Sequence, residues 1–180
     1  MTNSKPLVGQ AFPKITLSRL GGGTVELGTP ANGHDWQMIV IYRGKHCPIC
    51  TRYLTELEEI APELSRIGVD VVAASADPED RATHQAGEAG VSFPIGIGLG
   101  VGEMQTLGLY VSNPRSAEET DRPFAEPGLF VVNGAGELQV VDISNAPFAR
   151  PALSSMLMGL NFIKNPANNY PVRGTHHDNI

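Results

Sequence analysis

The feature that most restricts the fold is a pair of cysteines between a buried strand and a long helix. Residues 36–42 (WQMIVIY) form a continuous apolar run, which is typical of a strand buried on both faces. The motif Cys47-Pro48-Ile49-Cys50 follows, and apolar residues then recur at helical spacing up to residue 67, where Gly68 ends the pattern. A buried strand that leads directly into an amphipathic helix predicts an α/β domain.

The rest of the chain alternates in the same way. We expect extended pieces over residues 7–27 around a triple-glycine turn, and a second buried strand over residues 69–75. Asp77 is expected to cap a helix that ends at Gly90. The remaining expected elements are a strand over 93–97, a short helix over 100–108, a polar loop over 112–121, a hairpin of strands over 129–132 and 138–143, and a last helix over 151–160. These elements predict a mixed central sheet flanked by helices.

Length and charge limit the number of domains and the kinds of binding partner. The chain has 180 residues, which fits one domain over residues 1–165 and a polar tail over 166–180. Its net charge is −6 with no basic run, which argues against nucleic acid or an anionic membrane as partner. The first ten residues lack the apolar segment of a secretory signal, so we expect a cytoplasmic protein.

The cysteine spacing indicates thiol chemistry. Cys47 is expected at the helix N-terminus, where unpaired N–H groups and the helix dipole favour a thiolate. Lys45 and His46 add positive charge, and Pro48 suits the first helical turn. Cys50 lies one turn further on the same face, within reach of Cys47. We therefore expect an exposed reactive thiolate with a sheltered partner, which together form a reversible two-electron couple.

Two other interpretations remain open. The motif could be half of a zinc site, which needs two more ligands, but among the histidines only His176-His177 are close in sequence. Alternatively, both cysteines could be inert core residues. The position at a helix start favours the redox interpretation, and we predict no metal and no cofactor.

The cysteine segment also resembles a known family. The run Tyr42-Arg43-Gly44-Lys45-His46-Cys47-Pro48-Ile49-Cys50 is similar to the signature of the AhpC/TSA peroxiredoxin-like (redoxin) family of the thioredoxin superfamily. Residues 8–13 (VGQAFP), 71–78 and 126–136 (EPGLFVVNGAG) resemble other parts of the same family in the right order, so that the resemblance covers residues 6–160.

This resemblance implies a thioredoxin-like fold with a peroxiredoxin-type N-terminal β extension. It also implies reduction of peroxides or disulfides, with Cys47 as the attacking and Cys50 as the resolving cysteine. Pro127 matches the proline that is cis in thioredoxin folds and faces the cysteines, and Pro127, Gly44 and His46 are the implied substrate-binding residues. Thioredoxin or a small thiol would regenerate the enzyme, and a homodimer is compatible with the resemblance.

The sequence also departs from both parent families. Peroxiredoxins proper carry P-x-x-x-T-x-x-C, but Val40 and Gly44 occupy the proline and threonine positions. Pro127 replaces their sheet arginine, which leaves Arg43, Arg122 and Arg150 as alternatives. We choose Arg43 as the catalytic arginine because it lies closest before Cys47.

Thioredoxins have a buried acid in the strand before the cysteines, and residues 38–42 contain none. A peroxidase, a disulfide reductase and a binding module with vestigial or metal-binding cysteines therefore all stay open. The preferred prediction is a cytosolic thiol peroxidase.

Overall fold

The computed structural model describes residues 5–176. His177 of the histidine pair and the start of the segment inspected for a secretory signal lie outside these residues. A seven-stranded mixed sheet forms the centre, in the order β2-β1-β5-β4-β3-β8-β9. Its strands are β1 (Ile15–Arg19), β2 (Thr24–Leu27), β3 (Trp36–Ile41), β4 (Val69–Ala74), β5 (Ile95–Ile97), β8 (Gly128–Val132) and β9 (Leu138–Ile143).

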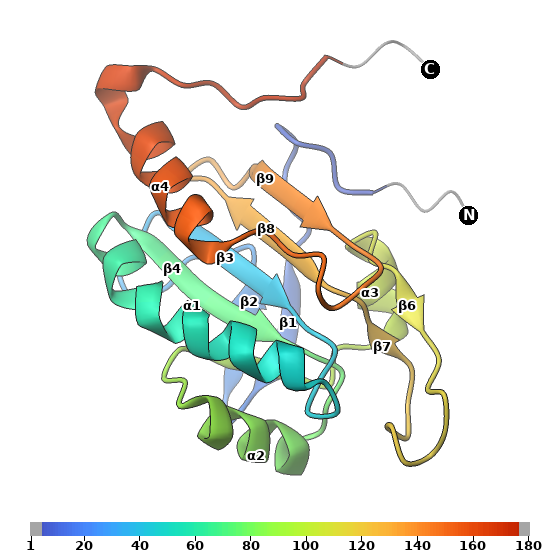
Figure 1. Cartoon of the computed structure of the whole chain (residues 1–180). Coiled ribbons are helices and arrows are strands. Elements are labelled where there is room, and N and C mark those ends of the chain that lie inside the picture. The colour runs from blue at the N-terminus through green and yellow to red at the C-terminus, as the bar shows by residue number, and fades with distance from the viewer. Residues whose placement is uncertain (1–4, 177–180) are drawn as a thin grey trace.

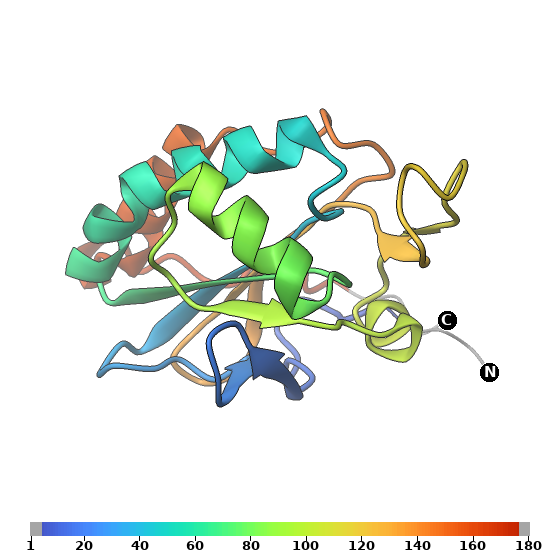
Figure 2. The ribbon, with the colours of Figure 1, turned by 90° about the horizontal axis from the view of Figure 1, so that it is seen from below.

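Helices cover both faces of this sheet (Figure 1, Figure 2). The helices α1 (Pro48–Arg66), α2 (Glu79–Ala89) and α4 (Leu153–Lys164) pack on one face, and α3 (Val101–Thr106) packs on the other. A short ribbon of β6 (Val111–Ser112) and β7 (Phe124–Ala125) lies beside α3. The mixed sheet flanked by helices is the predicted thioredoxin-like arrangement, and the β1–β2 hairpin is its expected N-terminal extension.

The centre of the sheet explains the apolar runs in the sequence. β3 pairs in parallel with β4 and antiparallel with β8, and five of its six residues are buried because both faces are covered. Helix α1 buries Cys50, Leu54, Leu57 and Leu64 against this face. It runs through Pro62 and ends at Arg66; Ile67 is its C-cap, and Gly68 follows with φ 80°.

The start of α2 differs from the prediction. Asp77 is not its cap: the helix begins at Glu79 after Pro78, which makes no side-chain cap. The Asp77 carboxylate instead accepts a hydrogen bond from Lys45 N at 2.7 Å. Asp77 therefore accepts its N–H from a residue 32 positions earlier in the sequence, not from the first turn of α2. This bond joins the loop before the cysteines to the segment that leads into α2.

The C-terminal helix is longer than predicted. α4 runs to Lys164, past the predicted end at residue 160, and the 3-10 turn η1 (Pro166–Asn168) follows. Residues 170–176 then run back beside the N-terminal segment, where Val172 and Thr175 lie near Gly9 (Figure 1). The described part of the predicted polar tail therefore packs on the domain.

Candidate active site

The two cysteines meet at the start of α1. Cys47 is the N-cap, and Pro48 takes the first helical position as predicted. Cys47 Sγ accepts the backbone N–H of Cys50 at 3.3 Å and the Cys50 thiol at 2.7 Å. Both cysteines are free thiols. The helix start therefore directs two donors at one sulfur, an arrangement that favours a thiolate on Cys47.

These contacts separate the acidities of the two thiols. The Cys50 thiol, followed by the Cys50 amide and the charges of Arg150 and Arg43, lowers the pKa of Cys47 to about 6 against the opposing effect of burial. Burial, followed by the hydrogen bond to Cys47, raises the pKa of Cys50. At neutral pH the pair therefore holds one negative charge, which lies on Cys47, and one proton, which lies on Cys50.

Two expectations about this pair need correction. Cys47 is not exposed: its relative accessibility is 2%, because its sulfur turns back toward Cys50 over the helix start. His46 supplies no positive charge at neutral pH either. Burial, followed by the nearby charge of Arg43, lowers the pKa of His46 below its usual value. The cations that act on Cys47 are instead Arg150 and Arg43.

Gly44 has a structural reason to lack a side chain. Its φ is 129°, a conformation that L residues rarely adopt, and a Cβ placed there would lie 2.8 Å from both carboxylate oxygens of Asp77. The Gly44 carbonyl accepts hydrogen bonds from Cys47 N at 3.1 Å and from Gln85 Nε2 at 3.0 Å. The Asp77 carboxylate therefore fills the space that the side chain of a threonine at position 44 would need.

Arg43 lies in an acidic and aromatic setting. Its Nε is 3.3 Å from Glu126 Oε2, and its Nη2 is 3.8 Å from Glu119 Oε1. The Glu126 contact is an ion pair without hydrogen-bond geometry, because neither of its two atoms makes a hydrogen bond. The guanidinium also lies 4.8 Å above the centre of the Phe124 ring. The charge of Arg43 therefore helps to lower the pKa of Cys47, while its guanidinium is paired with the carboxylates of Glu126 and Glu119.

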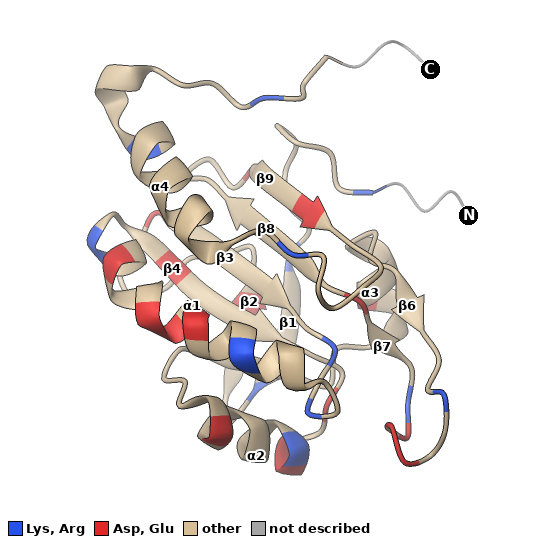
Figure 3. Ribbon diagram, in the orientation of Figure 1, with Lys and Arg blue, Asp and Glu red and all other residues tan. Residues whose placement is uncertain are grey.

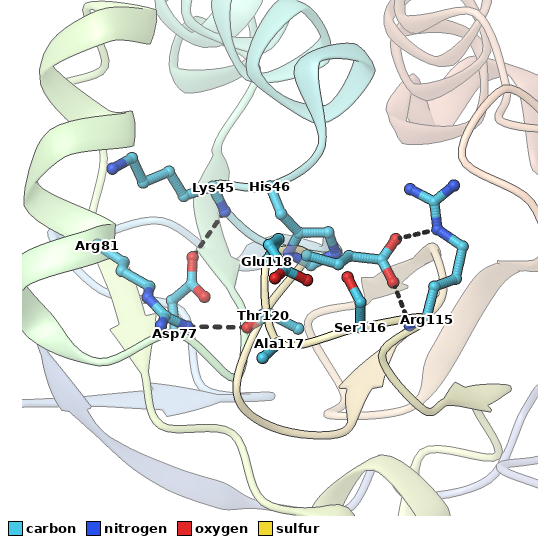
Figure 4. A pocket seen from close by; sticks show the side chains of 10 residues that line it. Lys45, His46, Asp77, Arg81, Arg115, Ser116, Ala117, Glu118 and Thr120 are labelled. Atoms are coloured by element: carbon cyan, nitrogen blue, oxygen red, sulfur yellow. Dashed lines mark hydrogen bonds and ion pairs between the residues drawn. The ribbon is translucent and has the colours of Figure 1, made fainter.

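His46 forms a wall of a charged cavity beside the cysteines (Figure 4). The cavity has a volume of about 490 Å³, and Asp77 and Arg81 lie on one side of His46 while Arg115 lies on the other. Both ring nitrogens of His46 are buried without a hydrogen-bond partner, and the ring packs 4.5 Å from that of Phe124. His46 is thus a neutral imidazole with unused hydrogen-bonding capacity next to Cys47.

Arg150 contacts the other sulfur. It lies in the loop between β9 and α4, and its Nη2 is 3.0 Å from Cys50 Sγ. Its guanidinium lies 4.9 Å above the ring of Tyr53, one helical turn after Cys50. Of the other two candidate arginines, Arg122 is paired with Asp121 at 2.8 Å. Arg150 is therefore the arginine in direct contact with the cysteine pair.

Pro127 does not have the predicted cis peptide bond. It precedes β8, whose first residue Gly128 pairs with Ile41 at the end of β3. It lines a small cleft with Tyr53 and Arg150. The structure contains no cis peptide bond among the described residues, so Pro127 is trans, the isomer that X–Pro bonds favour intrinsically.

Sequence reasoning missed Asp77, Gln85 and Glu126 as parts of this site. Asp77, which precedes α2, and Gln85 on α2 form hydrogen bonds with the loop before Cys47. Glu126 forms an ion pair with Arg43. Asp77 gave a signal, but a misleading one, because Asp before Pro also marks a helix start. Gln85 contacts Gly44 across 41 residues, and no local pattern encodes that distance. Among the described residues, no group of three or more His, Cys, Asp or Glu side chains is arranged to hold a metal.

Comparison with known proteins identifies the family. The AhpC/TSA family profile matches residues 8–141, which is most of the chain. This chain belongs to the AhpC/TSA family. Such a protein is a peroxiredoxin-like thiol oxidoreductase, and the pair of free thiols at a helix start agrees with that class. No curated protein matches the sequence significantly.

Solved structures give the same fold for this AhpC/TSA protein. A peroxiredoxin-like protein from Aquifex aeolicus is 14% identical with a TM-score of 0.72, and the match covers 88% of each chain. AhpC from Mycobacterium tuberculosis is 16% identical with a TM-score of 0.71, and 93% of this chain and 100% of that one are covered. A mutant of peroxiredoxin 6 from Arenicola marina is 20% identical with a TM-score of 0.69, covering 89% of this chain and 74% of that one.

Proposed function

We propose that this chain is a thiol peroxidase in which Cys47 attacks the substrate and Cys50 resolves the product. The Cys47 thiolate attacks one peroxide oxygen, the O–O bond breaks, and the departing oxygen leaves as an alcohol or water after taking a proton. Cys47 becomes a sulfenic acid. Cys50 then attacks the Cys47 sulfur, and hydroxide leaves with the Cys50 proton as water. The peroxide gains two electrons, and the two thiols become a disulfide.

The observation that carries this proposal is the asymmetry of the thiol pair. Cys47 Sγ accepts two donors while Cys50 Sγ supplies one of them, at 2.7 Å. A thiolate is the nucleophile in both steps, so Cys47 is the sulfur prepared to act first. The short distance between the sulfurs supports a resolving step that needs little rearrangement.

Around this pair we assign Arg43 as the donor to the departing oxygen. Its ion pair with Glu126 lacks hydrogen-bond geometry, so the Nε–H of Arg43 has no acceptor among the described residues and is free to donate to a substrate oxygen. His46, Gly44 and Pro127 are proposed to form the substrate-binding walls. The unpartnered nitrogens of His46 support this role, as does its position in the charged cavity.

A disulfide reductase is the second candidate, and Gly44 favours it. The Asp77 carboxylate occupies the space for the peroxide-binding threonine, so one donor of a peroxiredoxin is missing. A missing donor of this kind costs on the order of 10²–10³ in rate. In this version Cys47 attacks a substrate disulfide and expels one thiolate, and Cys50 then releases the other.

One pair of assays separates the two candidates. Peroxide reduction is measured by NADPH oxidation with thioredoxin and its reductase, and disulfide reduction by insulin turbidity with the same protein. We expect peroxide turnover that is detectable but slower than in peroxiredoxins proper. Insulin reduction without any peroxide turnover would overturn the peroxidase and establish the reductase.

Trapping tests the roles of the cysteines. Cys50→Ser is expected to accumulate a sulfenic acid on Cys47, which dimedone labels at that residue by mass spectrometry. Cys47→Ser is expected to leave Cys50 unlabelled. Labelling of Cys50 in the second variant would reverse the proposed roles.

The partners are proposals of the same kind. A thioredoxin-type protein or a small thiol would return the disulfide to the thiol pair, and the enzyme would act in the cytoplasm, where thiols stay reduced. A homodimer is compatible with this assignment, and sedimentation velocity would test it. Within residues 5–176 no helix is long and apolar enough to span a membrane.

A further inference from the structure

We propose that Arg150 is a catalytic residue of the resolving step, which stabilises the Cys50 thiolate as that sulfur attacks Cys47. The inference rests on the proposed thiol chemistry of the pair, whether the substrate is a peroxide or a disulfide. It assigns the two arginines near the pair to different steps, with Arg43 acting in the first and Arg150 in the second.

The geometry directs Arg150 at the second cysteine. Its Nη2 is 3.0 Å from Cys50 Sγ, and Cys50 Sγ is 2.7 Å from Cys47 Sγ. The three groups thus form a chain in which the guanidinium touches the inner sulfur and the inner sulfur touches the outer one. A residue that only stabilised the first thiolate would be expected to contact Cys47 instead.

The loop that carries Arg150 is anchored at several points. Arg150 Nη1 donates to Pro147 O at 2.8 Å, and Tyr53 Oη donates to Pro151 O at 2.8 Å. The loop begins at Ser144, whose N donates to Pro127 O at 3.1 Å. Because the guanidinium also stacks on the Tyr53 ring, little side-chain freedom remains to be lost when it binds a thiolate.

The attack of Cys47 on the substrate changes which thiolate Arg150 stabilises. Before it, Cys47 carries the negative charge, and the buried Cys50 keeps its proton. Once Cys47 is a mixed disulfide or a sulfenic acid, that charge is gone, and so is the nearest anion opposing ionisation of Cys50. Arg150 then acts on Cys50 alone and favours its thiolate, which is the form that attacks.

Few other ionisable groups face Cys50. Cys47 faces it from the start of α1, and Tyr42 faces it from the end of β3. Tyr53, one turn further along α1, contacts Arg150. Burial raises the pKa of both tyrosines, so they stay neutral. Asp142 of β9 lines the same small cleft as Arg150. Figure 3 shows one basic segment before α1 and another before α4, near the end of β3.

An aromatic disulfide, 5,5′-dithiobis(2-nitrobenzoate), separates the two steps without any peroxide. The Cys47 thiolate attacks one sulfur, the S–S bond breaks, and one coloured thiolate leaves. Cys50 then loses its proton to solvent and attacks Cys47 Sγ, and the second coloured thiolate leaves. The reagent accepts two electrons, and the protein gains a Cys47–Cys50 disulfide. Stopped-flow absorbance therefore gives one phase for each cysteine.

We expect Arg150→Gln and Arg150→Met to slow the second phase at pH 7 by roughly 10- to 100-fold, the size of a lost hydrogen bond to a charged group. The first phase should change much less. The second phase of both variants should then recover as pH rises, because hydroxide replaces the missing assistance to ionisation. Arg150→Lys should slow the second phase less than either variant, since it keeps the charge.

Two matched variants control the result. Arg52→Met removes a cation from an exposed position on the first turns of α1 and should leave both phases unchanged. Arg43→Met should affect the first phase more than the second. The rate of the first phase also reports whether each Arg150 variant keeps the folded cysteine pair.

The assignment is overturned if the Arg150 variants slow both phases equally, slow only the first, or slow neither. It is also overturned if the second phase is slowed at all pH values alike, because that marks a structural role. These outcomes do not depend on peroxide turnover. A failed peroxidase assay with a normal second-phase effect would reject the proposed peroxidase function and leave the role of Arg150 standing.

Discussion

Replacing Gly44 by alanine is expected to destabilise this protein more than the same change at Gly22, a glycine of positive φ whose Cβ would meet open space. Gly44 is buried before the cysteine motif, with φ 129°. A Cβ there lies 2.8 Å from both Asp77 carboxylate oxygens, a separation that real Cβ atoms essentially never show. Either the loop or the carboxylate must therefore move.

The size of the effect follows from two contributions. A non-glycine residue in a sparsely populated backbone region costs about 1–3 kcal/mol. Displacing the Asp77 carboxylate also weakens its 2.7 Å hydrogen bond from Lys45 N, and a charge-assisted bond contributes about 1.5–3 kcal/mol. Gly44→Ala should therefore lower the free energy of unfolding by about 2.5–6 kcal/mol.

Gly22 provides the matched control. Its φ is 112°, and a Cβ there would meet nothing within 4 Å, so Gly22→Ala carries the backbone cost alone. Urea unfolding monitored by circular dichroism gives both values by linear extrapolation. The double variant Gly44→Ala/Asp77→Ala should be less destabilised than the sum of its two single variants, because the second change removes the clash.

Equal losses for Gly44→Ala and Gly22→Ala would refute this reasoning, and so would strict additivity in the double variant. A confirmed result would also explain why threonine is absent here. Gly44→Thr would then be expected to lower stability rather than to restore a peroxide-binding hydroxyl.

Three further predictions concern the thiol and the core. The rate of Cys47 alkylation by iodoacetamide should rise as pH passes about 6 and then level off, because the thiolate is the reactive form. Cys50→Ala should move this rise to higher pH, because it removes the thiol that donates to Cys47. A rise in the unaltered protein only above about pH 8 would contradict the assignment. Arg43→Ala should slow peroxide turnover much more than alkylation, whereas equal slowing of both would mean that Arg43 only adjusts the thiolate. Leu64→Ala should cost about 2–5 kcal/mol in urea unfolding, against less than about 0.5 kcal/mol for the exposed Met158→Ala, and similar losses would argue against the described packing of α1.

The local patterns of the sequence determine the elements that build the site. The run over residues 36–42 becomes β3, because a continuous apolar run indicates a strand buried on both faces. The helical spacing after Cys47 becomes α1, because that periodicity indicates a helix buried on one face. The Asn133–Gly136 turn likewise joins β8 to β9 as predicted. The position of the cysteine pair at a helix start therefore follows from neighbouring residues alone.

Only the tertiary structure decides which groups surround the pair. Arg150 reaches Cys50 across 100 residues because β8 pairs with β3 and β9 pairs with β8, which brings the loop after β9 to the start of α1. Asp77 reaches the loop after β3 because β4 pairs in parallel with β3, so both strands end at the same edge. The sequence determines the reactive cysteine pair through local periodicity. The charges around the pair, the burial of the pair and the space beside Gly44 depend instead on strand order, which no local spacing encodes.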